Sequence, residues 1–152
     1  MAYTYIVKNG DAGVVISTGI TIIQVLAGAA SLELLRCGIS QGLSETSTME
    51  HVQILRKTAA ATVTAFTARR FNFLDPVALA VGGTAATGYT ATAEGSDGEV
   101  LIDDGWNILN GWQWKSGEDR IIVPQAGIIA MKFPVAPASA TWRAYMVFAE
   151  NR

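Results

Sequence analysis

The chain has few of the residues that build cross-links, metal centres or catalytic dyads. Its 152 residues include one cysteine, Cys37, so no disulfide can form within the chain and no thiolate cluster can hold a metal ion. They also include one histidine, His51. Cys37 lies in Leu34-Leu35-Arg36-Cys37-Gly38-Ile39, and we interpret it as a small buried residue because a nucleophilic thiol needs an activating base beside it. We expect no enzyme activity, no cofactor and no metal site.

Charge is scarce as well. Charged residues make up 16% of the chain, against about 25% in an average soluble domain, while half of the residues are hydrophobic. The formal net charge of −2 comes without a cluster of Lys and Arg, which nucleic-acid binding requires, so we expect no nucleic-acid partner. A surface with so few charges is expected to be covered in part by other proteins.

The longest stretch without charge runs from Ala12 to Leu32 and raises the question of a membrane span or a signal peptide. Polar residues interrupt it at Ser17, Thr21 and Gln24, and glycines break it further. These interruptions favour two strands and a turn over a lipid-facing helix. We therefore expect no membrane partner and no signal peptide.

Short segments rich in Val, Ile, Thr and aromatic residues recur between Gly, Pro, Ser and Asn, a pattern typical of many short strands. The clearest segment places Trp142, Ala144, Met146 and Phe148 on one face, which we predict to be core. The opposite face carries Tyr145 and Val147, apolar enough to suggest that it is covered too. We predict one all-β domain over residues 1–152, a two-sheet antiparallel sandwich, with strands at Tyr3–Val7, Gly13–Ser17, Ile20–Leu26, Leu32–Ile39, Met49–Lys57, Thr62–Thr67, Glu99–Ile102, Gly111–Lys115, Arg120–Val123, Gly127–Phe133 and Ala140–Ala149.

One segment also fits a helix. Ser47-Thr48-Met49-Glu50 matches a capping box, and Met49, Val52 and Leu55 recur at helical spacing. A helix over residues 48–61 is therefore an alternative to the strand, which the alternation of Val52, Ile54 and Arg56 favours.

Residues 68–98 form a long Ala/Thr/Gly-rich insertion or arm. Connections this long are usually functional or disordered, and this one has little bulk to add to a core. We expect it to lie on a partner, with aromatic and aliphatic anchors, since such residues dominate interface energetics. The candidate interface residues are Phe71, Phe73, Leu74, Tyr89 and Tyr145; alternatively, the aromatic residues of the arm plug the edge of the sandwich.

Two sequence patterns suggest a catalytic or metal-binding site, and other features of the sequence argue against each of them. Gly38-Ile39-Ser40-Gln41-Gly42 matches the G-x-S-x-G nucleophile elbow, but that fold places its histidine last in the chain, and His51 follows Ser40 by only eleven positions. The second pattern is a group of carboxylates without the spacing of a calcium-binding loop, and two of them begin ordinary Asp-Gly turns. Its members are Glu94, Asp97, Glu99, Asp103 and Asp104.

Trp112 and Trp114 lie on one face of a predicted strand. Exposed and coplanar, they would form a platform for stacking sugars, which would make the chain a carbohydrate-binding module. Tryptophans that close a sandwich core are the commoner arrangement.

Five segments carry a resemblance to a known family: 47–58, Asp103–Asn107, Gly111–Trp114, Arg120–Gly127 and Ala136–Glu150. Together they resemble small virion surface proteins of tailed bacteriophages, of the head decoration or cement type. The resemblance implies a jelly-roll sandwich in which Met49–Thr58 is a strand. It also implies a homo-oligomer, often a trimer, that binds the major capsid protein on the capsid surface after synthesis in the host cytoplasm. Another phage structural role, in a minor capsid, tail or baseplate protein, is the alternative, and the insertion at 68–98 has no counterpart in the resemblance.

Overall fold

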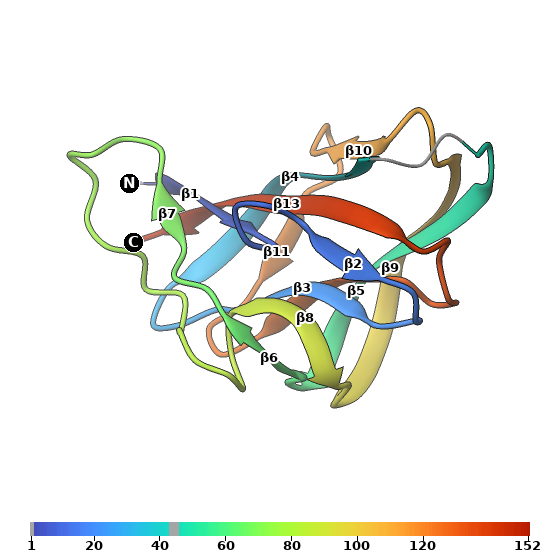
Figure 1. Ribbon diagram of the computed structural model, residues 1–152. Helices are drawn as coiled ribbons and strands as arrows, with labels where there is room; N and C mark the ends of the chain where they lie inside the picture. The colour runs from blue at the N-terminus through green and yellow to red at the C-terminus, as the bar shows by residue number, and fades with distance from the viewer. Residues whose placement is uncertain (1, 43–45) are drawn as a thin grey trace.

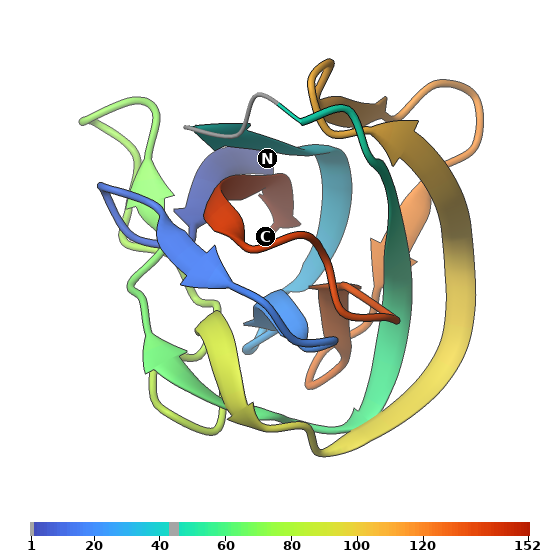
Figure 2. The same cartoon turned by 45° about the vertical axis from the view of Figure 1, so that its right-hand side comes forward.

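The computed structural model describes residues 2–42 and 46–152, which form a seven-stranded and a six-stranded antiparallel sheet packed face to face (Figures 1 and 2). Sheet A has the order β10 (Trp112–Lys115), β4 (Ser31–Gly42), β13 (Ala140–Asn151), β1 (Ala2–Lys8) and β7 (Arg69–Arg70), with β11 (Ile121–Val123) beside β4 and β2 (Val14–Ile16) beside β13. Sheet B has the order β6 (Thr62–Ala65), β8 (Gly88–Ala93), β3 (Thr21–Leu26), β12 (Ile128–Lys132), β5 (Met49–Ala59) and β9 (Ser96–Asn107).

The predicted all-β sandwich is confirmed. The chain crosses repeatedly between the sheets, so β3, β5 and β12 in sheet B each have a sequence neighbour in sheet A, as in a jelly-roll-like sandwich. Within the described residues there is no helix at all, and so none that could span a membrane.

The core lies between the two sheets, and the predicted inward face of β13 is part of it. Trp142, Ala144, Met146 and Phe148 are all buried. The Trp142 ring packs against Phe133 at 5.1 Å and edge-on against Trp106 at 5.7 Å between ring centroids, and its Nε1 donates to the carbonyl oxygen of Ile16 at 3.2 Å. Aromatic packing of this kind joins residues from both sheets into one interior.

The segment that also fitted a helix is strand β5. It lies between β12 and β9 and forms ladders with both, while Val52 and Ile54 face the core. Leu55 points to the other face and is also fully buried. Met49 is 69% exposed, so the apolar residues that mimic a helical period lie in three different environments and do not share one buried face.

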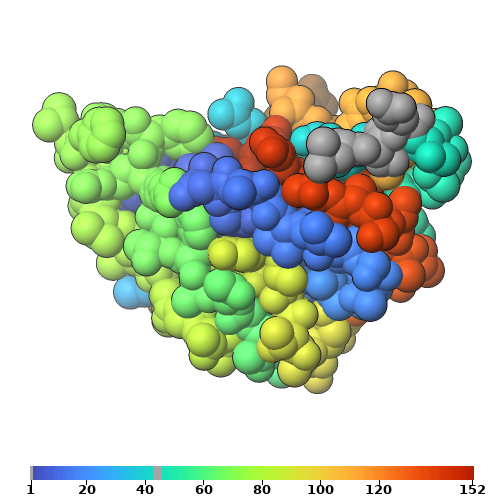
Figure 3. Space-filling model, in the orientation of Figure 1, coloured from blue at the N-terminus to red at the C-terminus, as the bar shows by residue number. Residues whose placement is uncertain are grey.

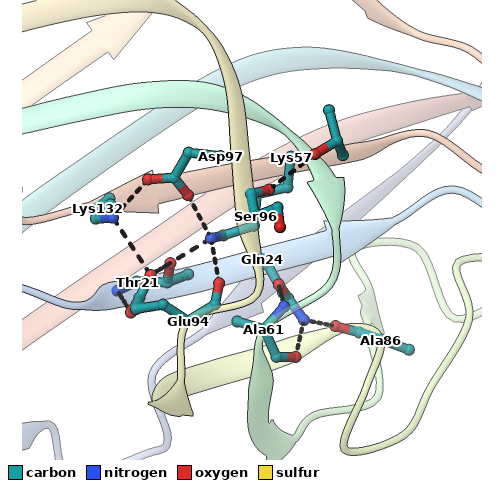
Figure 4. A network of polar contacts seen from close by, with 10 residues as sticks. Thr21, Gln24, Lys57, Ala61, Ala86, Glu94, Ser96, Asp97 and Lys132 are labelled. Carbon is teal, nitrogen blue, oxygen red and sulfur yellow. Dashed lines mark hydrogen bonds and ion pairs between the residues drawn. The ribbon is translucent and has the colours of Figure 1, made fainter.

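The segment 68–98 is not one long arm, which corrects the expectation of an insertion with little part in the core. It contains β7, β8 and the first residues of β9, and β8 lies inside sheet B between β6 and β3. Its small residues permit close approach of backbones: a Cβ at Gly88 would lie 2.2 Å from the carbonyl oxygen of Thr64. The buried Gln24 amide links this segment to the turn between β5 and β6, since its Nε2 donates to the carbonyl oxygens of Ala86 (2.6 Å) and Ala61 (2.8 Å) (Figure 4).

Four charged side chains fasten the turn between β8 and β9 to sheet B (Figure 4). Lys57, whose side chain is fully buried, and Lys132 each lie 2.5–2.6 Å from Asp97 and 3.4–3.5 Å from Glu94. Glu94 also accepts hydrogen bonds from the backbone N and the Oγ1 of Thr21 at 2.6 and 2.7 Å. Burial raises the pKa of Asp97, but hydrogen bonds from Lys132 and Lys57 outweigh it and hold that pKa below its ordinary value. Glu94 and Asp97, two members of the carboxylate group noted in the sequence, are thus paired with lysines.

Candidate functional site

The segment after β7 is the most exposed apolar part of the described chain. We call residues 71–81 the arm. It leaves the edge of sheet A, passes the paired ends of β1 and β13, and returns to sheet B, so that it projects at the end of the sandwich where both termini lie (Figures 1 and 3).

Side chains of sheet A hold the backbone of the arm in place. The Glu150 carboxylate, on a residue that is 1% exposed, accepts hydrogen bonds from the backbone N of Leu79 (3.0 Å) and of Ala80 (2.8 Å). Arg152 pairs with Glu150 at 2.8 Å and donates to the carbonyl oxygen of Val77 at 2.6 Å, while the Tyr5 hydroxyl donates to Pro76 at 3.0 Å. Hydrogen bonds between a charged group and backbone amides are among the strongest in proteins, so these contacts hold the backbone of the arm in one conformation.

A tight turn forms the tip of the arm. The Asn72 side-chain oxygen accepts a hydrogen bond from the backbone N of Leu74 at 3.1 Å, an Asx turn, and Arg70 donates to the carbonyl oxygen of Asp75 at 2.8 Å. The turn directs Phe73 and Leu74 into solvent, where they are 88% and 93% exposed.

The rest of the arm alternates between small inward and larger outward residues. Ala78 and Ala80 pack against the core, and the backbone at Leu79 comes so close to Gly28 that a Cβ there would lie 1.9 Å from the Leu79 carbonyl oxygen. A single exposed apolar side chain is ordinary, whereas a contiguous group marks an interaction surface. The exposed apolar residues of the arm are Phe71, Phe73, Leu74, Val77, Leu79 and Val81.

Two hollows flank the turn of the arm. One, of about 430 Å³, lies between Arg70, Phe73 and Val77. The other, of about 290 Å³, lies where Phe71 meets Arg36 and Val147 on the outer face of sheet A, and the Arg36 guanidinium is 6.0 Å from the centre of the Phe71 ring. Projecting side chains beside hollows give the arm a surface to which a protein of complementary shape can bind.

The five candidate interface residues do not form one surface. Phe71, Phe73 and Leu74 lie together in the arm. Tyr89 lies on β8, half-buried, with its ring edge-on to Phe66 at 6.2 Å. Tyr145 lies on the outer face of sheet A, where Gln113 donates a hydrogen bond to its hydroxyl. The arm therefore unites three of the five.

The tryptophans considered for sugar stacking face inward. Trp112 is buried in the core, and its Nε1 donates to Asp104 at 2.8 Å. Trp114 packs against the same core. Neither offers the open, coplanar platform that stacking would need.

The serine and the histidine of the elbow pattern lie on opposite faces of the sandwich. Ser40 is near the C-terminal end of β4 on the outer face of sheet A, and His51 lies on β5 in sheet B, where it contacts Asp103. Burial raises the pKa of the Cys37 thiol to about 12, despite a hydrogen bond from the backbone of Trp114, so the thiol stays protonated.

Glu150, Arg152 and Tyr5 were not identified from the sequence. Tyr5 and Glu150 lie in β1 and β13, where they read as ordinary strand residues, and Arg152 follows directly after β13. The one available signal is that Glu150 follows the apolar run Met146–Ala149, since a carboxylate at the end of a buried strand needs partners.

The comparisons with known proteins add no family to this picture: no protein-family model, no curated protein and no solved structure matches the chain.

Proposed function

We propose that the chain is a structural virion protein of a tailed phage, a decoration or cement protein that binds the assembled head as an oligomer, with the trimer as the expected form and the major capsid protein as partner. The observation that supports a docking role is the arm, a backbone-anchored loop that exposes Phe73 and Leu74 almost completely. The phage context rests on the sequence resemblance alone.

An exposed apolar loop of this kind is suited to stabilising an assembled shell by binding to it. A protein that binds only the assembled shell stabilises that state by mass action. Burying a Phe and a Leu side chain contributes roughly 3–6 kcal/mol per arm before the cost of association, at about 1.5–3 kcal/mol each. An oligomer multiplies such contacts, because binding by the first arm raises the effective concentration of the others. No catalytic step is part of this role.

Co-sedimentation of the purified protein with empty capsids, combined with light scattering of the free protein, tests the proposal. We expect an oligomer that pellets with shells, and we expect Leu74→Asp to abolish pelleting. Leu109→Asp is the matched control, because Leu109 is an exposed leucine outside the arm. A persistent monomer that never pellets with heads refutes the proposal, and pelleting with tails alone assigns the protein to the tail or baseplate.

A further inference from the structure

The strand register of sheet A assembles a second surface on its outer face, away from the tip of the arm. Gln113, Gly38, Tyr145 and Lys8 lie in one row across β10, β4, β13 and β1. In the next row Ser40 lies opposite Arg143. We call these six residues the Tyr145 platform.

The Tyr145 ring lies flat across the strand beside it. A Cβ at Gly38 would lie 2.8–2.9 Å from the hydroxyl, Cζ and Cε1 of Tyr145, so only a glycine leaves room for the ring. The Gln113 amide fixes the hydroxyl by donating a hydrogen bond of 2.5 Å. With one side of the ring against Gly38, the half-buried side chain presents its other side to solvent.

Two hollows of about 250 and 260 Å³ meet at this ring and at Ser40, which line both. Lys8, Arg143 and the Asp11 carboxylate, which pairs with Lys8, line the first hollow. Asn110, Gln113 and the buried Trp112 line the second. Together the hollows form a shallow trough that crosses the sheet, with the Tyr145 ring at its centre and amides at one end. The other end holds Arg143 and the ion pair of Lys8 with Asp11.

The charge of this face is opposite to that of the chain. Arg36 and Lys115 occupy the row on the other side of Gly38 and add two cations to Lys8 and Arg143. Of these four, Lys8 alone forms an ion pair with a described residue, Asp11, at 2.8 Å. The other three, Arg36, Lys115 and Arg143, form no ion pair with a described residue, so this face carries a local excess of positive charge although the net charge of the whole chain is −2.

We propose that the Tyr145 platform binds an acidic glycan, a sugar chain that carries uronic acid carboxylates. An exposed ring face stacks on the apolar face of a sugar, while the amides of Gln113 and Asn110 and the Ser40 hydroxyl suit sugar hydroxyls. The Arg143 guanidinium matches a carboxylate in two parallel hydrogen bonds. A shallow open trough admits a chain rather than a small enclosed ligand.

A single-stranded nucleic acid is the competing ligand class. Proteins that bind it stack successive bases on several aromatic rings, and Tyr145 is the single aromatic residue of the platform. The neutral hydrogen-bonding groups beside the ring also favour sugar hydroxyls. We therefore treat nucleic acid as an outcome of the test.

Saturation-transfer NMR and calorimetry with a hexamer of galacturonic acid test the proposal, with the fully methyl-esterified hexamer as the ligand control. We expect saturable binding of the acid and about tenfold weaker binding of the ester, equivalent to roughly 1.4 kcal/mol. Arg143→Gln should weaken binding of the acid to a similar degree. Tyr145→Phe, which keeps the ring, should retain stacking, and Tyr145→Ala should lose it.

Arg56→Ala is the matched control variant, because Arg56 is an exposed arginine of sheet B, paired with Glu99. Its affinity should equal that of the wild type. Circular dichroism checks that each variant folds, and Arg143→Gln keeps the test decisive if Tyr145→Ala does not fold. Absence of saturable binding, equal affinity for acid and ester, or equal binding of polyglutamate or a single-stranded oligonucleotide overturns the proposal. This test is independent of capsid binding, so either proposal can fail alone.

Discussion

Replacing Glu150 by alanine should release the arm from sheet A. The substitution removes a buried carboxylate that accepts hydrogen bonds from the backbone N of Leu79 and Ala80 and pairs with Arg152. A net contribution of about 1.5–3 kcal/mol per hydrogen bond to a charged group sets an upper limit of roughly 3–6 kcal/mol for the two amides. Because the released arm can open to water and satisfy its amides there, we expect a smaller loss, of about 2–3 kcal/mol, in the free energy of unfolding.

Urea denaturation followed by tryptophan fluorescence measures that loss, and amide hydrogen exchange locates it. Exchange at Leu79 and Ala80 should accelerate in Glu150→Ala while exchange in β4 stays slow. Glu99→Ala is the control, since Glu99 forms an exposed ion pair with Arg56, which contributes about 1 kcal/mol or less. Unchanged exchange at Leu79 and Ala80 would show that Glu150 does not hold the arm and would refute the reasoning.

Three further predictions concern the sandwich itself. Because the pKa of Asp97 is held below its ordinary value of 3.8, its ionised form stabilises the fold above that pH, and this stability is lost as the pH falls through the lowered value; acid unfolding of Asp97→Asn should therefore depend less on pH in this range. Gly88→Ala should destabilise the protein by more than about 2 kcal/mol in urea titrations, because the new Cβ meets the carbonyl oxygen of Thr64, whereas Gly82→Ala, with open space around it, should not. The Cys37 thiol should resist iodoacetamide in the folded protein and react after denaturation, and rapid labelling under native conditions would contradict its burial.

The sequence predicted the strands whose faces differ in polarity and missed those that depend on close backbone packing. In β13 the alternation of Trp142, Ala144, Met146 and Phe148 against Arg143 indicated the buried face directly. In β8 the residues are Gly, Thr, Tyr and Ala, and their role follows from the approach of Gly88 to Thr64, which no periodic pattern records. The composition that suggested a loose arm is thus the composition that tight packing requires.

The candidate sites also differ in how far the sequence predicts them, because local patterns are visible in the sequence and cross-strand contacts are not. Phe73 and Leu74 could be singled out, because large apolar residues beside Asn and Pro in a turn-rich segment have few ways to be buried. The hydrogen bonds of Glu150 and Arg152 to the arm join residues about seventy positions apart, and only the pairing of β1, β13 and β7 brings these residues together. The Tyr145 platform likewise follows from cross-strand register, which aligns Gln113, Gly38 and Lys8 with Tyr145. The sequence marked Tyr145 as an apolar outward position and a candidate interface residue, without these neighbours.

Phe71, where the arm begins, lies beside Arg36, one row from the Tyr145 platform, but the Glu150 end of the arm and the Ser40–Arg143 row of the platform are far enough apart for both to be occupied at once. Both are attached to β13: Glu150 holds the arm near one end, and Arg143 lies seven residues earlier in the strand. At about 3.3 Å per residue this separation is roughly 23 Å, more than the width of a sugar chain. A subunit held on a protein surface by Phe73 and Leu74 would leave Ser40 and Arg143 in solvent. Leu74→Asp should therefore abolish capsid binding without changing affinity for the acidic hexamer, and a loss of both activities would show that the two surfaces share one ligand.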